Sequence, residues 1–369
     1  MQNLLVLGPL PPPLTGTPVS FEIFCEHAKK STLIKKLIVV DSSPKFLKQQ
    51  KKFEFSLRNI KQALSIIYKF AINITKADSA IIFGSNGYIV SLAPILLLIA
   101  KRHNKKCFFR AFGGSLDQYI LNLSPPQKWL ALTTLRNFSG VIVQTKFLRE
   151  HFSQKLGNSA IHYVAGYRQP LEKSGMKKKK KRDLKLKIVF VGIVKEDKGI
   201  FVLLDAMKKL SAGKIDVELT VYGSIHEPIR NKFEKLTKDL DNTSYGGIID
   251  WRDVVNILSH QDLLVLPTFY HSEGHPGVLI EAMMAGIPIV STNFRSIPEL
   301  VTHERNGLLV PPSSVCELTE SIKRLARDRQ LLNQMATINA QMSQNFTANK
   351  NVNNIIEIAL DQPKPHTPN

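Results

Sequence analysis

Two glutamates bracket a short segment in which the chain changes character. Glu273 and Glu281 stand eight positions apart in HSEGHPGVLIE, and two glycines, a proline and three aliphatic residues lie between them. Carboxylates can orient the hydroxyl groups of a sugar or take part in acid–base chemistry. Which chemistry is open to the pair depends on the elements that hold the two side chains.

A buried strand, a loop and a helix are expected around these glutamates. The short apolar run DLLVLPT (262–268) is typical of a buried strand, and VLIEAMMAG (278–286) predicts a helix that ends at its glycine. Glu273 then lies in the strand-to-helix loop, and Glu281 lies in the first turns of the helix. In open α/β sheets this edge is where ligands bind.

The start of that helix predicts an anion site. The first amides of a helix have no acceptor inside it, and the helix dipole adds positive potential there. We therefore expect the amides of Gly277, Val278 and Leu279 to bind a phosphate. A plainer alternative is that Glu281 only complements its own helix dipole, worth about 0.3–1 kcal/mol, and that Glu273 is a solvated loop charge.

Two further loops have a similar pattern. VFVGIVKEDKG (189–199) predicts a strand, a loop and a helix start, with Lys198 beside another set of free amides. Facing a diphosphate, this ammonium would stabilise a leaving group; otherwise it is a surface charge. GPLPPPLTG (8–16) follows the first expected strand, and Gly16 permits close approach of the backbone to a ligand.

The whole chain alternates short apolar runs with amphipathic ones, which predicts βα units and parallel sheets. With 369 residues, two domains are expected. The fold class is thus α/β, with two Rossmann-like domains and an interdomain cleft. The expected strands are 3–8, 36–41, 79–85, 105–113 and 140–145, then 187–192, 217–223, 245–249, 262–268, 288–292 and 307–312.

A run of lysines separates the two halves. We place the first domain at 1–175, a Lys-rich linker at 176–186 and the second domain at 187–345. The segment 346–369 is expected to pack back on the first domain, with a disordered tail. The last helix of the second domain is expected at about 315–327, with more helical sequence after it.

Composition limits the setting. The net charge of +20 predicts attraction to polyanions or anionic lipid. The longest apolar stretch, 92–100, is about half of what crosses a bilayer, so membrane contact should be peripheral. The N-terminus lacks a charged region before its apolar run and predicts a strand. Cys25, Cys107 and Cys316 suggest neither disulfides nor zinc, which favours a reducing cytosol.

Three segments together resemble a known family. EGHPGVLIE (273–281), AMMAGIPIVSTNFRSIPELV (282–301) and NGLLVPP (306–312) resemble the retaining glycosyltransferases of family four, the glycosyl transferases group 1, which have the GT-B fold. The resemblance is dense over 187–327 and thinner, but consistent in order, over 1–170.

This resemblance implies a nucleotide-diphosphate sugar as donor, with UDP as the expected nucleotide, held mainly by the second domain. Glu273 would contact the transferred sugar, and His275 would touch the sugar or orient the loop. Glu281 would bind the ribose. Lys198, with the three amides at the helix start, would hold the diphosphate.

The resemblance also implies the walls of the site. Gly223 and the segment 293–299 would line the nucleotide side, and Gly16 would approach the donor from the first domain. The acceptor, a glycan or lipid-linked glycan, would enter over the loops at Gly16 and at Gly113 and Gly114.

Two positions depart from the family pattern. Many members have arginine where this chain has Ile193, so one diphosphate contact is missing unless Lys195 or Arg110 replaces it. Many also have histidine where this chain has Phe112. Arg110 is assigned to the acceptor side.

The implied mechanism needs neither a metal nor a cofactor. Departure of the nucleoside diphosphate leaves growing negative charge on the phosphate, which the helix amides and Lys198 oppose. The acceptor then attacks on the side that the leaving group vacates, and its proton passes to a phosphate oxygen. Retention through this front-face attack is implied by the family alone.

Other enzyme classes fit less well. A retaining glycosidase needs carboxylates about 5–5.5 Å apart, whereas eight helical positions span roughly 12 Å. A metal-dependent transferase needs an Asp-x-Asp motif, which Asp239 and Asp241 match, but at the end of an expected helix. The histidines have no metal-ligand spacing.

A non-catalytic alternative is a basic protein that binds anionic membrane or nucleic acid. The basic residues are scattered and no nucleic-acid module is recognisable, so no nucleic-acid partner is expected. Membrane docking is compatible with catalysis, through the basic runs 177–182 and 45–52. The resemblance and the charge together suggest bacterial surface polysaccharide synthesis, of lipopolysaccharide or capsule, in the cytoplasm at the inner face of the membrane.

Overall fold

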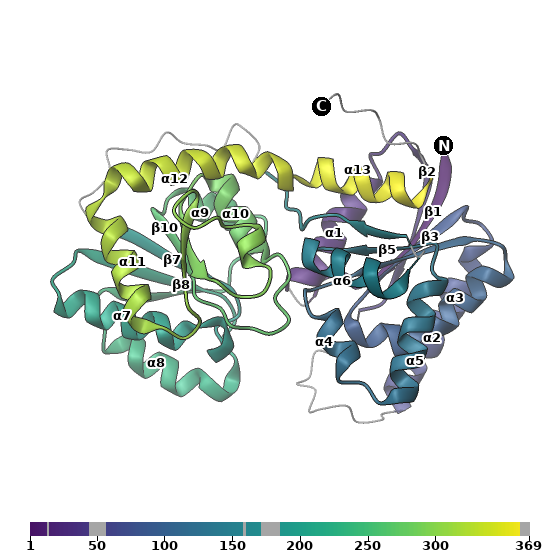
Figure 1. The fold of residues 1–369 in the computed structure, drawn as a ribbon, viewed down its shortest axis with the longest axis horizontal. Helices are drawn as coiled ribbons and strands as arrows, with labels where there is room; N and C mark the ends of the chain where they lie inside the picture. Colours follow the sequence, from purple (N-terminus) through teal and green to yellow (C-terminus); the bar gives the residue numbers. More distant parts are fainter. Residues whose placement is uncertain (13–14, 44–56, 158–159, 171–184, 362–369) are drawn as a thin grey trace. The chain divides into compact units, whose positions relative to one another are not determined.

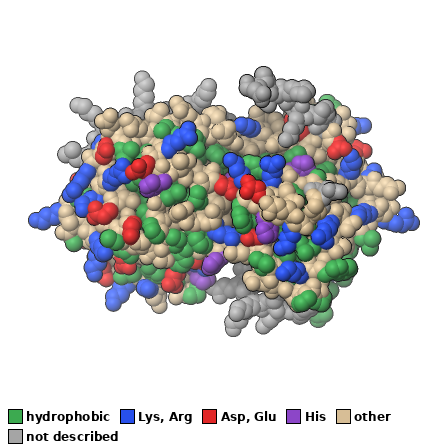
Figure 2. Space-filling model, viewed as in Figure 1, with side chains coloured by type: hydrophobic (Ala, Val, Ile, Leu, Met, Phe, Trp, Pro, Cys, Tyr) green, Lys and Arg blue, Asp and Glu red, His purple; other side chains and the backbone are tan. Residues whose placement is uncertain are grey.

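The computed structural model describes residues 1–12, 15–43, 57–157, 160–170 and 185–361 (Figure 1 and Figure 2). The chain forms two compact units. Unit 1 contains Met1–Tyr167 and Ala348–Asn369, and unit 2 contains Arg168–Thr347. The basic runs 177–182 and 45–52 lie outside the described residues, as does most of the expected linker. None of the helices within the described ranges is long and apolar enough to span a bilayer.

Unit 1 is built on a six-stranded parallel sheet in the order β2-β1-β3-β4-β5-β6. The strands are β1 (Gln2–Gly8), β2 (Ile34–Asp41), β3 (Ser79–Gly84), β4 (Lys106–Ala111), β5 (Gly140–Val143) and β6 (Ile161–Tyr163). The helices are α1 (Gly16–Ala28), α2 (Leu57–Ile74), α3 (Leu92–Arg102), α4 (Leu116–Leu121), α5 (Pro125–Asn137), α6 (Lys146–Leu156) and α13 (Ala348–Ala359). All adjacent strands pair in parallel, as the alternating pattern predicts.

The sheet of unit 1 is apolar on both faces because helices cover both. On one face, Phe109 of β4 packs in a buried cluster with Phe70 of α2 and Leu96 of α3. The other face is covered by α1 and by α13, which returns from the C-terminal end of the chain and contacts α1, β3 and β4 (Figure 1). The short strand β6 has half-buried residues and gave no apolar run to recognise.

Unit 2 has a second six-stranded parallel sheet, in the order β12-β11-β10-β7-β8-β9. Its strands are β7 (Leu186–Val191), β8 (Val217–Tyr222), β9 (Thr243–Gly247), β10 (Leu263–Leu266), β11 (Ile289–Thr292) and β12 (Gly307–Val310). Its helices are α7 (Ile200–Ala212), α8 (Arg230–Lys238), α9 (Val254–Ser259), α10 (Gly277–Ala285), α11 (Val315–Arg327) and α12 (Arg329–Met342). From β9 to β12 this is the strand order of a Rossmann fold.

Local chemistry sets the ends of several helices in unit 2. Helix α10 ends at Gly286, which adopts the left-handed conformation with φ 64°. Helix α12 begins after Asp328, whose carboxylate accepts from the Leu331 amide at 2.8 Å. Strand β9 lies two residues earlier than expected, because this edge strand is largely exposed and lacks a buried apolar run.

Unit 2 begins with Arg168, earlier in the chain than the expected boundary. The Arg168 amide donates to the carbonyl of Phe346 at 3.0 Å, and Arg168 forms a parallel bridge with Thr347. The two ends of unit 2 are therefore held side by side. This contact puts Arg168 into the second unit, where its side chain becomes part of the site described below.

Candidate functional site

The strand order of unit 2 reverses between β7 and β10, and ligands bind open α/β sheets at such a point. The loops that follow these two strands are 192–199 and 267–276. They contain Lys198 and Glu273, the two residues that the sequence selected as catalytic. The topology of the sheet therefore brings the two loops to one place.

Lys198 and Glu273 form an ion pair, although 75 positions separate them in the chain. The Lys198 Nζ lies 2.6 Å from the Glu273 Oε2, and the side chains are 18% and 8% exposed. The Thr268 hydroxyl donates to the same carboxylate oxygen at 2.9 Å. The Lys198 ammonium also lies 4.6 Å from the ring centroid of Tyr270, within cation–π range. The Lys198 ammonium and the Glu273 carboxylate thus form a partly buried ion pair.

Backbone packing fixes the Lys198 loop against the Glu273 loop. The amide of Phe269 donates to the carbonyl of Asp197 at 2.8 Å. Gly199 has φ 78°, and a Cβ there would lie 2.1 Å from the carbonyl oxygen of Pro267. Only glycine permits this conformation and this contact together. Lys198 is held toward Glu273 for that reason.

Side chains from the 293–299 segment hold the Glu273 loop from the other side. The Ser296 hydroxyl donates to the carbonyl oxygens of Glu273 and Gly274. The His275 Nε2 lies 3.3 Å from the Glu299 Oε2. The segment expected to line the nucleotide therefore contacts the Glu273 loop, and His275 has a loop-orienting contact. A contact of His275 with a sugar stays a prediction.

Glu281 is buried on α10 and pairs with an arginine that the sequence did not select. The Arg168 Nε donates to the Glu281 Oε1 at 2.7 Å, and the two side chains are 9% and 8% exposed. Burial raises the pKa of the Glu281 carboxyl, and the guanidinium opposes that rise. Arg168 belongs to no motif, and only the return of the chain at Phe346 positions it, so the sequence carried no signal for this pair.

Gly277 leaves room for the Arg168 side chain at the N-terminus of α10. A Cβ on Gly277 would lie 1.6 Å from the Arg168 Nη2, so glycine leaves the space that the guanidinium fills. A cation beside a helix N-terminus is disfavoured by the dipole unless an anion compensates it. Glu281 supplies one negative charge, and the remaining positive potential favours an anionic ligand.

The expectation of three free amides at this helix start is wrong at Leu279. Its N–H donates to the carbonyl of Pro276 at 3.1 Å, which closes a tight first turn. Among the described residues we find no protein acceptor for the amides of Gly277 and Val278. Two amides, with Arg168 beside them, therefore replace the expected three.

The expectation for Arg110 is also wrong. Its side chain is buried within unit 1, where Nη2 donates to the carbonyls of Val164 at 2.9 Å and Ala165 at 3.5 Å. Burial lowers the pKa of Arg110 to about 10. It holds the segment after β6 and leaves almost no surface for an acceptor. Lys195, the other suggested replacement at the Ile193 position, pairs with Asp197 at 2.6 Å.

The other glycines selected from the sequence lie in the segments that follow strands. Gly16 is the first residue of α1, and its carbonyl accepts from the Ser20 hydroxyl at 2.7 Å. Gly113, with φ 81°, and Gly114 follow β4. Gly223 follows β8 and has φ 132°, and a Cβ there would lie 1.8 Å from the carbonyl oxygen of Gly192. Their contacts with donor or acceptor stay predictions.

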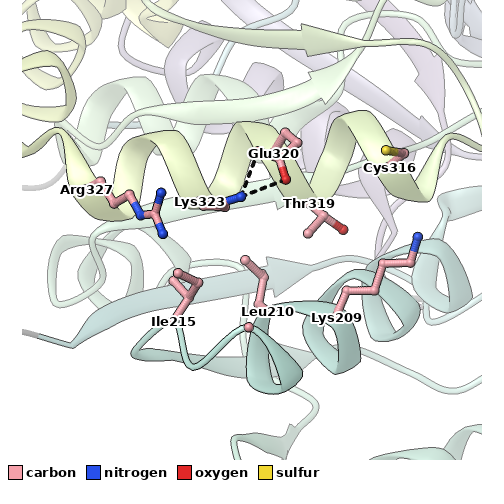
Figure 3. Close-up of a pocket in the computed structure, with 9 residues that line it drawn as sticks. Lys209, Leu210, Ile215, Cys316, Thr319, Glu320, Lys323 and Arg327 are labelled. Atoms are coloured by element: carbon pink, nitrogen blue, oxygen red, sulfur yellow. Dashed lines mark hydrogen bonds and ion pairs between the residues drawn. The ribbon is translucent and has the colours of Figure 1, made fainter.

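A cavity of about 350 Å³ lies elsewhere in unit 2, between α7 and α11 (Figure 3). The lining includes the end of α7 just before β8, which is the edge at which the strands begin. The Lys323 ammonium on its wall is paired with Glu320 at 3.0 Å. This cavity is separate from the switch point. The full lining is Lys209, Leu210, Gly213, Ile215, Cys316, Thr319, Glu320, Lys323 and Arg327.

The two parallel sheets and the switch-point site define a protein of the GT-B fold. The crystal structure of Anabaena Alr3699/HepE in complex with UDP and glucose is similar over 98% of this chain and 100% of that one, with a TM-score of 0.70 and 16% identity. The predicted α/β fold class with two Rossmann-like domains is confirmed.

Residues 172–342 match the family model described as glycosyl transferases group 1, which confirms the resemblance to group 1 for this stretch. Both glutamates and Lys198 lie within it. The α-D-kanosaminyltransferase of Streptomyces kanamyceticus is 24% identical over 58% of this chain and 57% of its own length. The putative colanic acid biosynthesis glycosyltransferase WcaL of Escherichia coli is 31% identical over 40% of this chain and 36% of its own. The chain spans 33% to 63% of the length of several curated relatives that it matches.

Proposed function

We propose that this chain transfers a sugar from a nucleotide-diphosphate sugar to a hydroxyl group of a glycan or lipid-linked glycan, with retention of configuration. The observation that carries the proposal is the Lys198–Glu273 pair at the switch point of unit 2. The match to glycosyl transferases group 1 over this region supports the reaction class. UDP is the proposed nucleotide, because the similar Anabaena structure contains it.

The proposed donor site uses both ion pairs. The diphosphate binds beside the Lys198 ammonium and the amides of Gly277 and Val278. Arg168 supplies the second cation, which compensates for the aliphatic Ile193. The Arg168 guanidinium, whose Nε donates to Glu281, opposes the rise in pKa that burial causes and so favours the carboxylate form, which is a good acceptor for ribose hydroxyls.

The proposed reaction breaks the bond between the anomeric carbon and the diphosphate oxygen. Negative charge grows on the leaving phosphate, and Lys198 stabilises it more strongly than it stabilises the ground state. Glu273 then faces the positive charge that develops on the sugar. The acceptor oxygen forms the new bond on the vacated side, and its proton moves to the leaving phosphate. These groups of the chain carry each step, so we propose a reaction without a metal or cofactor.

The proposed setting is bacterial surface polysaccharide synthesis, of lipopolysaccharide or capsule, supported by the similarity to the colanic acid enzyme. With a lipid-linked acceptor, the proposed location is the cytoplasm, in peripheral contact with the inner face of the membrane. The net charge of +20 supports this contact with an anionic leaflet.

A panel of nucleotide sugars tests the reaction, with binding and hydrolysis measured separately. We expect Glu273→Gln to lose about 10²–10³-fold in turnover while nucleotide binding is kept. Lys198→Met should lose turnover and weaken diphosphate binding. Lys195→Met is the matched control, because Lys195 also lies near the Tyr270 ring, at 5.3 Å, yet pairs with a different carboxylate.

The control should keep turnover within a few-fold of the parent. Failure of the parent chain to bind any nucleotide sugar would refute the proposed function. Equal losses in both lysine variants would refute the specific role of Lys198. Thermal melting of each variant separates these outcomes from loss of folding.

A further inference from the structure

Helix α2 of unit 1 exposes a row of large apolar side chains. Tyr68 is 67% exposed and Leu64 is 59% exposed. The spacing of three or four residues places the whole row on one face of the helix. The row consists of Leu57, Ile60, Leu64, Tyr68 and Ile72.

The opposite face of α2 already provides the contact with the core. Ile66, Phe70 and Ile74 are buried in the cluster beneath the sheet. A surface helix of a globular protein usually has one apolar face, and its other face is polar. Helix α2 is apolar on both faces. One face is buried in the core of unit 1, and the other has no partner among the described residues.

The neighbouring helix also exposes large apolar side chains. Helix α3 packs against α2 and exposes Ile95 and Leu98, the latter by 69%. We call the exposed residues of α2 and α3 together the α2 face. Large apolar side chains exposed together on two packed helices are typical of an interaction site.

The charged residues along α2 and at the end of α3 are all basic. Residues 57–76 contain no aspartate or glutamate. Lys61 and Lys69 lie exposed along α2, and Lys76 follows it. Lys101 and Arg102 lie exposed at the end of α3. An apolar row flanked by cations is the pattern of a helix that lies in the interface of an anionic membrane.

A second copy of the chain fits this face less well. A symmetric dimer would bring the same patch of both copies together. Lys61 and Lys69 of one copy would then approach the same cations of the other, which disfavours association. An anionic leaflet instead offers hydrocarbon to the apolar row and phosphate to the lysines.

We propose that the α2 face docks the chain on an anionic lipid surface, with α2 parallel to the membrane plane and its apolar row inserted among the lipids. This inference deepens the proposed peripheral membrane contact by naming its surface, and it does not depend on sugar transfer. Interfacial helices insert by roughly 5–10 Å, a depth that the side chains of the row can reach while the lysines stay at the headgroups.

Vesicle flotation of the full chain tests this surface. The probes are vesicles of phosphatidylcholine alone and of phosphatidylcholine mixed with phosphatidylglycerol. The double variant Leu64→Ser/Tyr68→Ser should bind the mixed vesicles at least about 10-fold more weakly than the parent, because two inserted side chains are lost. Ile248→Ser is the matched control, because Ile248 is a large apolar side chain, 66% exposed, on unit 2.

Three results are expected together. The parent and Ile248→Ser bind the mixed vesicles equally, the double variant does not, and Lys61→Gln/Lys69→Gln loses the preference for anionic lipid. Equal vesicle binding by the parent and the Leu64→Ser/Tyr68→Ser variant would overturn the proposal. So would a parent dimer that this variant converts to a monomer in size-exclusion chromatography, because the face would then bind a second copy.

The same samples separate docking from catalysis. Nucleotide-sugar hydrolysis needs no vesicle, so it should be unchanged in the double variant. A chain that docks through α2 but turns over no nucleotide sugar would refute the proposed function and leave the docking surface standing. A chain that turns over nucleotide sugars and binds vesicles without using α2 would refute the docking surface and leave the proposed function standing.

Discussion

Replacing Arg168 with methionine tests whether the buried ion pair on α10 organises the site. The substitution keeps an unbranched side chain but removes the guanidinium that donates to Glu281 at 2.7 Å. Because the two side chains are only 9% and 8% exposed, the remaining carboxylate would stay buried with its charge uncompensated. We expect the free energy of unfolding of unit 2 to fall by about 3–5 kcal/mol.

An exposed ion pair in the same unit provides the control. The Arg230 Nη2 lies 2.6 Å from the Glu227 Oε1, a similar distance, but these side chains are 39% and 54% exposed. Arg230→Met should cost no more than about 1 kcal/mol, because solvent screens exposed pairs. The difference between the two variants isolates the effect of burial.

The loss of unfolding free energy in Arg168→Met should also depend on pH, and the pKa of Glu281 sets the direction of that dependence. Burial raises the pKa of its carboxyl above the unfolded value, and Arg168 opposes this rise. The folded state therefore binds more protons in the window between the two pKa values, and stability falls as pH rises through it. Removing Arg168 moves the folded pKa higher. The cost of Arg168→Met should thus be largest above both pKa values and shrink as the pH approaches the unfolded value of about 4.3.

Urea unfolding followed by tryptophan fluorescence measures this cost. The chain has two tryptophans, Trp129 in unit 1 and Trp251 in unit 2, so a Trp129→Phe background makes Trp251 a reporter of unit 2. The expected loss corresponds to a midpoint shift of roughly 1–3 M urea. Equal shifts for Arg168→Met and Arg230→Met, or a shift that does not change with pH, would refute the reasoning.

Two further variants test local packing. Gly199→Ala places a methyl group 2.1 Å from the carbonyl oxygen of Pro267, at a residue with a φ of 78°. We expect the free energy of unfolding to fall by about 1–3 kcal/mol, measured by thermal unfolding. An unchanged melting temperature would contradict this. Cys316 is exposed, whereas burial raises the pKa of Cys25 to about 12 and also raises that of Cys107. One thiol of the native chain should therefore react rapidly with a disulfide reagent, and Cys316→Ser should abolish this reaction. Rapid reaction of two thiols would contradict this, because it would show that a buried cysteine is accessible.

Much of the fold could be predicted from local pattern. The apolar runs located most strands to within two residues, and the glycine at 286 fixed the end of α10. The exception is β6, an edge strand whose residues are half-buried and form no apolar run. Strand β9, an edge strand that is largely exposed, was expected two residues too late. The alternation of strands and helices implied parallel sheets, because a parallel connection needs a crossover helix.

The position of the candidate site could be predicted in part. The sequence placed Glu273 in a loop and Glu281 on a helix, because strand and helix periods are local properties. It also selected Lys198. It could not show that Lys198 and Glu273 pair, or that Leu279 uses its amide in a tight turn, because both depend on the geometry of the folded loops.

Tertiary structure alone decided the partners of the buried charges. Arg110 and Arg168 are both arginines in the first half of the chain, yet Arg110 is buried among backbone carbonyls of unit 1, and Arg168 pairs with Glu281 in unit 2. The same holds for α2, where Tyr68 and Phe70 are both aromatic, but only Phe70 reaches the core. The sequence determines which segments are apolar and how they fold locally; which side of each segment is buried, and which charge meets which, follows only when distant segments pack together.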